Sequence, residues 1–136
     1  MMPTQAFSYT KIVVADIEAS EAFYGSALGM TTVMRGTMGE TDWAHEECVM
    51  TTTGEMSIPM LQLIRYHDKP VPAPTGVWLG FNVTDLDAVI EKVGAAGGSV
   101  LMAPKLIEEH NLILMAAVVA DPEGHMIELI EMLGDS

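Results

Sequence analysis

The chain has 136 residues, of which 49% are hydrophobic, and this predicts a folded domain with a sizeable core rather than a disordered segment. Six Lys and Arg stand against 19 Asp and Glu, and the resulting formal charge of −13 argues against nucleic acid and anionic membrane surfaces as partners. No apolar run reaches the length of a membrane helix. The first residues lack a signal-peptide pattern, and the single cysteine, Cys48, cannot form an internal disulfide, so we expect a cytoplasmic protein.

In chain order, the first half predicts a strand, a helix and three further strands. Alternating apolar residues over 7–15 are typical of a strand, and Asp16 is a suitable N-cap for a helix from about Ile17 to Leu28 that Gly29 ends. Strands are then expected near residues 31–35, 44–52 and 60–66. The proline-rich segment 69–76 predicts a stiff linker.

The second half predicts the same order of elements. A strand over 77–83 leads into a helix that Asp85 or Thr84 caps and that Gly97-Gly98 ends. Further short strands are expected near residues 99–102, 112–120 and 126–132. The segment Asp121-Pro-Glu-Gly124 predicts a turn between the last two of these strands.

Two local echoes indicate an internal duplication. Met60-Leu-Gln-Leu-Ile64 reads like Met126-Ile-Glu-Leu-Ile130, 66 residues later, and Val14-Ala-Asp-Ile-Glu-Ala19 reads like the segment 69 residues later. The predicted fold class is therefore α+β. Two βαβββ modules, residues 7–68 and 77–132, would form a cupped mixed sheet around a central cavity within a single domain spanning 1–136.

Period-two alternation separates the strand residues into two faces. Leu61 and Leu63, like Ile127 and Leu129, are expected to face the helices. The opposite faces then carry Tyr9, Lys11, Gln62, Trp78, Asn82, Met126 and Glu128. A carboxylate on a largely apolar strand face is costly unless that face meets water, a partner or a metal, so Glu128 is expected to point into a concave site.

Three motifs together resemble the vicinal oxygen chelate superfamily, which includes glyoxalase I, bleomycin-resistance proteins, extradiol dioxygenases and methylmalonyl-CoA epimerase. The motifs are Asp121-Pro-Glu-Gly-His-Met-Ile-Glu-Leu-Ile130, Val14–Tyr24 with Leu28-Gly29-Met30, and Phe81-Asn-Val-Thr-Asp-Leu-Asp87. The resemblance covers nearly the whole chain, and it implies the fold more specifically than it implies a substrate.

The resemblance also implies where a metal would bind. In metal-dependent members, the first strand of each module supplies a histidine and the last strand supplies an oxygen ligand. The matching positions here are Tyr9, Trp78, Gln62 and Glu128. Because an indole offers no lone pair and a neutral phenol is a poor ligand, we expect neither a metal nor another cofactor.

The remaining groups favour acid–base chemistry. Glu128 is the expected general base, Tyr9 a donor to a developing oxyanion, and Lys11 a further catalytic candidate. The expected contacts to a small-molecule substrate are Gln62, Trp78, Asn82, Met126 and His110, the last in a loop over 108–111 that could fold over the pocket. This pattern predicts a metal-independent lyase, isomerase or cyclase that forms a homodimer.

Two alternatives stay open at this point. The acidic charge and the missing histidines favour a non-catalytic protein that binds or sequesters a small molecule, as bleomycin-resistance proteins do. A third hypothesis is an atypical metalloenzyme that recruits His45 or His110. Glu46, Glu47, Glu108 and Glu109 are expected to be solvated charges, and His125 is expected either to point to the face away from Glu128 or to cap a turn.

Overall fold

The structure, a computed structural model, describes residues 2–135 and divides into two compact units. The first unit comprises residues 2–25 and 29–72, and the second comprises 26–28 and 73–135. The assignment of both units to a single domain stays a prediction. No helix among the described residues has both the length and the apolar character needed to cross a membrane.

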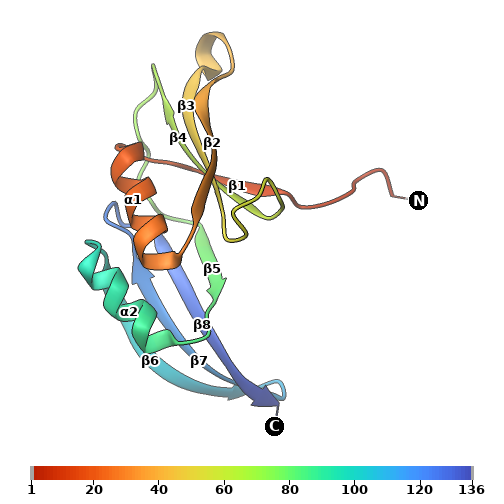
Figure 1. Cartoon of the computed structure of the whole chain (residues 1–136), viewed down its shortest axis with the longest axis vertical. Coiled ribbons are helices and arrows are strands. Elements are labelled where there is room, and N and C mark those ends of the chain that lie inside the picture. The colour runs from red at the N-terminus through yellow and green to blue at the C-terminus, as the bar shows by residue number, and fades with distance from the viewer. Residues whose placement is uncertain (1, 136) are drawn as a thin grey trace. The chain divides into compact units, whose positions relative to one another are not determined.

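The first unit is built on a four-stranded mixed sheet (Figure 1). Its elements are β1 (Tyr9–Val13), α1 (Ile17–Leu28), β2 (Thr31–Met38), the 3-10 turn η1 (Thr41–Trp43), β3 (His45–Thr51) and β4 (Met60–Tyr66). The strands lie in the order β1-β4-β3-β2, with β1 parallel to β4 and the other pairs antiparallel.

The second unit repeats this arrangement. Its elements are β5 (Trp78–Asn82), α2 (Leu86–Ala95), β6 (Ser99–Glu109), β7 (Leu112–Ala120) and β8 (Met126–Asp135). The strand order β5-β8-β7-β6 matches that of the first unit strand for strand. The predicted pair of βαβββ modules is confirmed.

Both helices begin and end where local chemistry requires. The Asp16 carboxylate accepts a hydrogen bond from the Ala19 N–H at 3.0 Å, and the Asp85 carboxylate accepts one from the Ala88 N–H at 3.1 Å. Asp85 rather than Thr84 is therefore the N-cap of α2. Gly29 closes α1 in the left-handed region at φ 67°, a conformation that glycine adopts without strain.

Strand β6 differs most from its prediction. It was expected to end near Met102, yet it continues to Glu109 through Pro104. Proline lacks the N–H of a central strand, but β6 lies at the edge of its sheet, and its register shifts between Met102 and Lys105. Sheet pairing with β7 thus overrides the local signal of a strand end.

The outer face of each sheet, defined here as the face that its helix covers, holds much of the apolar core. On this face Leu63 and Cys48 are register partners, and Glu21 of α1 accepts a hydrogen bond from the Cys48 thiol. Leu61, Leu63, Ile127 and Leu129 are all buried, as their predicted facing required. We call the opposite face of each sheet its inner face.

Candidate functional site

The inner face of the first unit follows from strand register. Lys11 of β1 pairs with Gln62 of β4, and Gln62 pairs with Val49 of β3. Glu47 and His45 lie two and four residues before Val49, so they point to the same face as Lys11 and Gln62. The sequence had left the facing of His45 open, and the pairing of β3 with β4 decides it.

A buried carboxylate lies at the centre of this face. Glu47 Oε1 is 3.2 Å from Lys11 Nζ and 3.1 Å from His45 Nε2. The Glu47 side chain is only 5% exposed, so the expectation that it is a solvated charge is wrong. Burial of a carboxylate is tolerated here because two basic side chains contact the same oxygen.

His45 contacts two oxygen atoms. Its Nδ1 lies 2.7 Å from the Trp43 carbonyl oxygen, and its Nε2 lies 3.1 Å from Glu47 Oε1. These two contacts orient the imidazole ring against the buried carboxylate.

Gln62 adds an unsatisfied acceptor beside this cluster. The residue is 7% exposed, and its Oε1 has no hydrogen-bond partner within residues 2–135. Tyr9 is 47% exposed on the same strand face as Lys11, and the Lys11 nitrogen lies 5.7 Å from the centroid of its ring. Tyr9, Lys11 and Gln62 are thus brought together, as the alternation predicted.

The inner face of the second unit has a different character. Glu128 of β8 lies in register between Gly80 of β5 and Val118 of β7. Its side chain is half-buried, and within residues 2–135 the structure gives it no hydrogen bond or ion pair. A Cβ added at Gly80 would meet no atom within 4 Å, so the space beside Glu128 is open.

Aromatic, amide and thioether side chains flank Glu128. Trp78 pairs with Met126, and Asn82 pairs with Ile130, all on the same inner face as Glu128. Trp78 is 54% exposed, which leaves a large flat surface available. Trp78, Asn82, Met126 and Glu128 therefore share one face, as the sequence indicated.

The two other histidines considered for a role lie in turns. Glu108 and Glu109 belong to β6, so the expected loop over 108–111 is a two-residue hairpin whose central residues, His110 and Asn111, both have positive φ. A contact between His110 and a ligand stays a prediction. His125 Nδ1 lies 2.9 Å from Asp121 Oδ2 and braces the turn before β8.

The donor set does not fit the metal centre that the family resemblance implies. The four matching positions carry Tyr9, Trp78, Gln62 and Glu128, of which Trp78 has no lone pair to donate. His45 directs both ring nitrogens at oxygen acceptors. Within residues 2–135, no group of three or more His, Cys, Asp and Glu side chains is arranged to hold an ion.

Cys48 lies on the outer face and belongs to the attachment of α1. Burial raises the pKa of its thiol to about 11, so the reactive thiolate is scarce at neutral pH. A hydrogen bond from Thr32, at 2.6 Å, lowers the pKa of Glu21 despite partial burial, and Arg35 contributes at 2.7 Å. These contacts fix α1 to the sheet.

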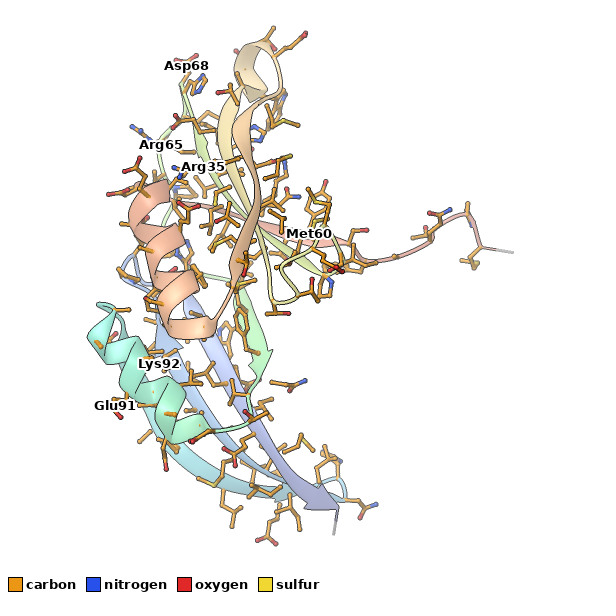
Figure 2. All side chains as sticks on the ribbon, in the orientation of Figure 1. Arg35, Met60, Arg65, Asp68, Glu91 and Lys92 are labelled. Atoms are coloured by element: carbon orange, nitrogen blue, oxygen red, sulfur yellow. The ribbon has the colours of Figure 1, made fainter. Side chains whose placement is uncertain are left out.

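A polar cleft of about 410 Å³ also opens on the outer side, at the start of α1. Arg35 and Arg65 line it, as Figure 2 shows, together with Asp16, Glu18 and Glu46. The three carboxylates outnumber the two guanidinium groups by one, and Arg35 is already paired with Glu21. The cleft is thus a solvated charged surface rather than a second candidate site.

Two βαβββ units in one chain, each with a four-stranded mixed sheet, are the architecture of the glyoxalase-like class of proteins. The sequence profile of the Glyoxalase/Bleomycin resistance protein/Dioxygenase superfamily matches residues 6–129. The chain belongs to this superfamily, as its motifs indicated. No curated protein matches the chain.

Solved structures support the same fold. A glyoxalase family protein from Bacillus cereus has a TM-score of 0.76 at 18% identity, over 98% of this chain and 99% of that one. A glyoxalase/bleomycin resistance protein from Albidiferax ferrireducens T118 has a TM-score of 0.66 at 22% identity, over 92% and 98%. A glyoxalase I variant from Zea mays has a TM-score of 0.70 at 22% identity, over 91% and 45%.

Proposed function

We propose that the chain binds a small molecule on the inner face of its second unit and catalyses a metal-independent proton transfer, as a lyase, isomerase or cyclase, with Glu128 as general base. The observation that carries the proposal is the unpaired Glu128 carboxylate on a half-buried face, with open space over Gly80. A positioned carboxylate that no protein group neutralises is available to accept a proton from a substrate carbon next to a carbonyl.

The other inner-face residues have defined tasks in this proposal. On the second unit, Trp78 stacks on the ligand, Met126 supplies apolar contact and Asn82 offers a hydrogen bond, while His110 is a more distant candidate contact. On the inner face of the first unit, taken by itself, Lys11 and Tyr9 are candidate donors to an anionic oxygen. Gln62 would orient a carbonyl or hydroxyl group.

In the proposed step, the C–H bond breaks and its proton moves to a Glu128 oxygen. The electron pair moves through the carbon framework to the carbonyl oxygen and gives an enolate. Return of the proton to a different carbon completes an isomerisation. In an elimination, the enolate expels a group from the adjacent carbon, the group leaves with its bonding electron pair, and the proton on Glu128 passes to that group. Neither route needs an oxidant or a reductant.

Replacement of Glu128 by Gln tests this function. Gln is nearly isosteric but cannot take a proton, so Glu128→Gln should lower turnover on the order of 10²-fold or more and leave substrate affinity nearly unchanged. The substrate would first be found in a thermal-shift screen of small carbonyl compounds. Glu91→Gln on α2 (Figure 2) makes the same charge change at an exposed site and should retain full turnover. Full turnover in Glu128→Gln would exclude Glu128 as the base.

A second candidate function, sequestration of a cationic molecule without turnover, is favoured by Trp78. Its exposed ring lies on the same strand face as Gly80, which follows two residues later and is the register partner of Glu128. An aromatic face beside a carboxylate suits a cation. In that case Trp78→Ala and Glu128→Gln should both weaken the binding of quaternary ammonium compounds, and no turnover should be found.

We further propose that the protein is a cytoplasmic homodimer. Exposed apolar side chains on β6 and β8 support an interface between copies, and they include Leu101, Leu106 and Leu133. The free thiol of Cys48 is compatible with a reducing compartment. Light scattering after size-exclusion chromatography would give the mass of a dimer, and Leu106→Glu should shift it to that of a monomer.

A further inference from the structure

The Lys11 ammonium retains binding capacity after it contacts Glu47. An ammonium group has three N–H donors, and Glu47 Oε1 accepts one of them at 3.2 Å. The Lys11 side chain is 35% exposed, whereas those of Glu47 and His45 are 5% and 10% exposed. A ligand can therefore reach Lys11, while Glu47 and His45 act behind it as positioning residues.

Lys11 presents the charge of this cluster that a ligand can reach. The chain has a formal charge of −13, with six Lys and Arg residues in all. Glu47 holds the ammonium in place, but the Glu47 carboxylate is only 5% exposed, whereas the Lys11 side chain is 35% exposed. An anionic ligand is favoured at this position on the inner face.

Gln62 specifies a second feature of the ligand. Its buried Oε1 has no partner within residues 2–135, and an unsatisfied buried acceptor destabilises a protein. The register partner of Gln62 on β3 is the apolar Val49, which is 1% exposed and offers no hydrogen bond from its side chain. The missing partner is therefore a hydrogen-bond donor that a ligand brings.

We propose that Lys11 and Gln62 form a binding site for a small carboxylate that carries a hydroxyl or N–H group close to its charge. The two residues are direct register partners in parallel strands, which are spaced about 4.8 Å apart. The carboxylate of the ligand contacts Lys11, and its donor contacts Gln62 Oε1. The inference rests on the proposed small-molecule function, but it does not depend on proton transfer to Glu128.

Three matched probes separate the two contacts. Mandelate has both groups, phenylacetate lacks the hydroxyl, and mandelamide lacks the charge. Each would be titrated into the full-length, ¹⁵N-labelled protein, and amide shifts in β1 and β4 would give affinities. We expect phenylacetate and mandelamide each to bind roughly 10-fold more weakly than mandelate, the scale of one hydrogen bond or more.

Variants then assign each contact to a residue. Gln62→Met removes only the unpartnered amide, so it should fold, reduce mandelate affinity to that of phenylacetate, and leave phenylacetate affinity unchanged. Lys11→Met should weaken both acids roughly 10-fold or more and leave mandelamide unaffected. Lys92→Met removes the same charge from exposed α2 (Figure 2) and should change none of the affinities.

The outcomes distinguish this site from the proposed enzyme. Equal affinities for mandelate and phenylacetate, no binding of mandelate, or equal losses in Lys11→Met and Lys92→Met would each overturn the site. Glu128→Gln should bind mandelate as wild type does. Failure of Glu128→Gln to lower turnover would remove the base but leave the anion site standing.

Discussion

The two units share a backbone plan but differ in the chemistry of their inner faces. Lys11 corresponds by register to Gly80, because Lys11 pairs with Gln62 as Gly80 pairs with Glu128. Glu47 corresponds to Ala116, since they pair with Ile64 and Ile130 respectively. By the same register, His45 corresponds to Leu114.

The first unit thus has a charged, hydrogen-bonded inner face, whereas the second has an apolar wall with one carboxylate. The comparison shows that duplication fixed the framework of caps, strand order and register, and left the inner positions free to diverge. A glycine opposite Glu128 leaves one unit with an unpaired anion, and a lysine opposite Gln62 gives the other unit an ion pair with Glu47. The following predictions test whether these differences have the energetic consequences that we infer.

The largest loss of stability should come from placing a carboxylate, equivalent to that of Glu47 in the first unit, at the corresponding position of the second unit. Ala116 is 2% exposed and Lys105 is its one basic neighbour in register, so Ala116→Glu made in a Lys105→Met background would bury an unpaired carboxylate, with Lys105→Met alone as the reference protein. We expect a loss of about 4 kcal/mol in unfolding free energy, measured by urea denaturation. Ala103→Glu, at an exposed position on β6, is the control and should change stability by less than about 0.5 kcal/mol.

The converse change removes the central charge of the first unit. Glu47→Ala leaves Lys11 and the ring of His45 without their shared acceptor, and it should lower unfolding free energy by about 3 kcal/mol. The triple variant Lys11→Met, Glu47→Leu, His45→Leu replaces the whole group by apolar side chains. It should recover most of that loss, and a triple variant less stable than Glu47→Ala would contradict this account of the cluster.

The outer faces of the two units should differ in how their contribution to stability depends on pH. The first unit has Cys48, which can ionise, where the second has Ala117, which cannot. The folded pKa of Cys48 is about 11, against an ordinary value of 9.0, so the folded state retains the proton longer than the unfolded state. The stabilisation that Cys48 gives the folded state is therefore fully present below pH 9 and is lost as the pH rises toward 11. The unfolding free energy should fall by about 2 to 3 kcal/mol over that interval.

Denaturation of the wild type and of Cys48→Ala between pH 8 and 11 measures this effect. The wild type should lose stability more steeply than Cys48→Ala over that interval. The same burial predicts that iodoacetamide reacts slowly with the folded protein at pH 8 and rapidly after unfolding. Parallel pH profiles for the two proteins would show that the thiol does not contribute.

The smallest effect should be the same in both units, because the helix caps were retained. Asp16→Ala and Asp85→Ala each remove a hydrogen bond that a backbone N–H donates to a carboxylate, from Ala19 at 3.0 Å and from Ala88 at 3.1 Å. We expect losses of about 1 kcal/mol for each in thermal denaturation. Thr84→Ala, next to the Asp85 cap, should cost less than half as much, and equal losses would mean that the cap is shared.

Much of the framework could be predicted from the sequence, because its signals are local. The bounds of α1, β4 and β7 agree with those predicted from alternation, from Asp16 as N-cap and from Gly29 as the end of α1. The repeat of 60–64 at 126–130 predicted two modules. The opposite facing of Gln62 and Leu63 followed from the two-residue period of a strand.

Tertiary structure alone decided what lies beside those side chains. Nothing in the stretch His45-Glu-Glu-Cys48 indicates which glutamate is buried, because facing depends on the register between β3 and β4, which brings together residues distant in sequence. That register buries Glu47 against Lys11 and His45 and leaves Glu46 exposed. Local sequence determined how side chains alternate between the two faces of each strand. Long-range pairing decided which charges meet, because a buried carboxylate is stable only where distant strands bring it a basic partner.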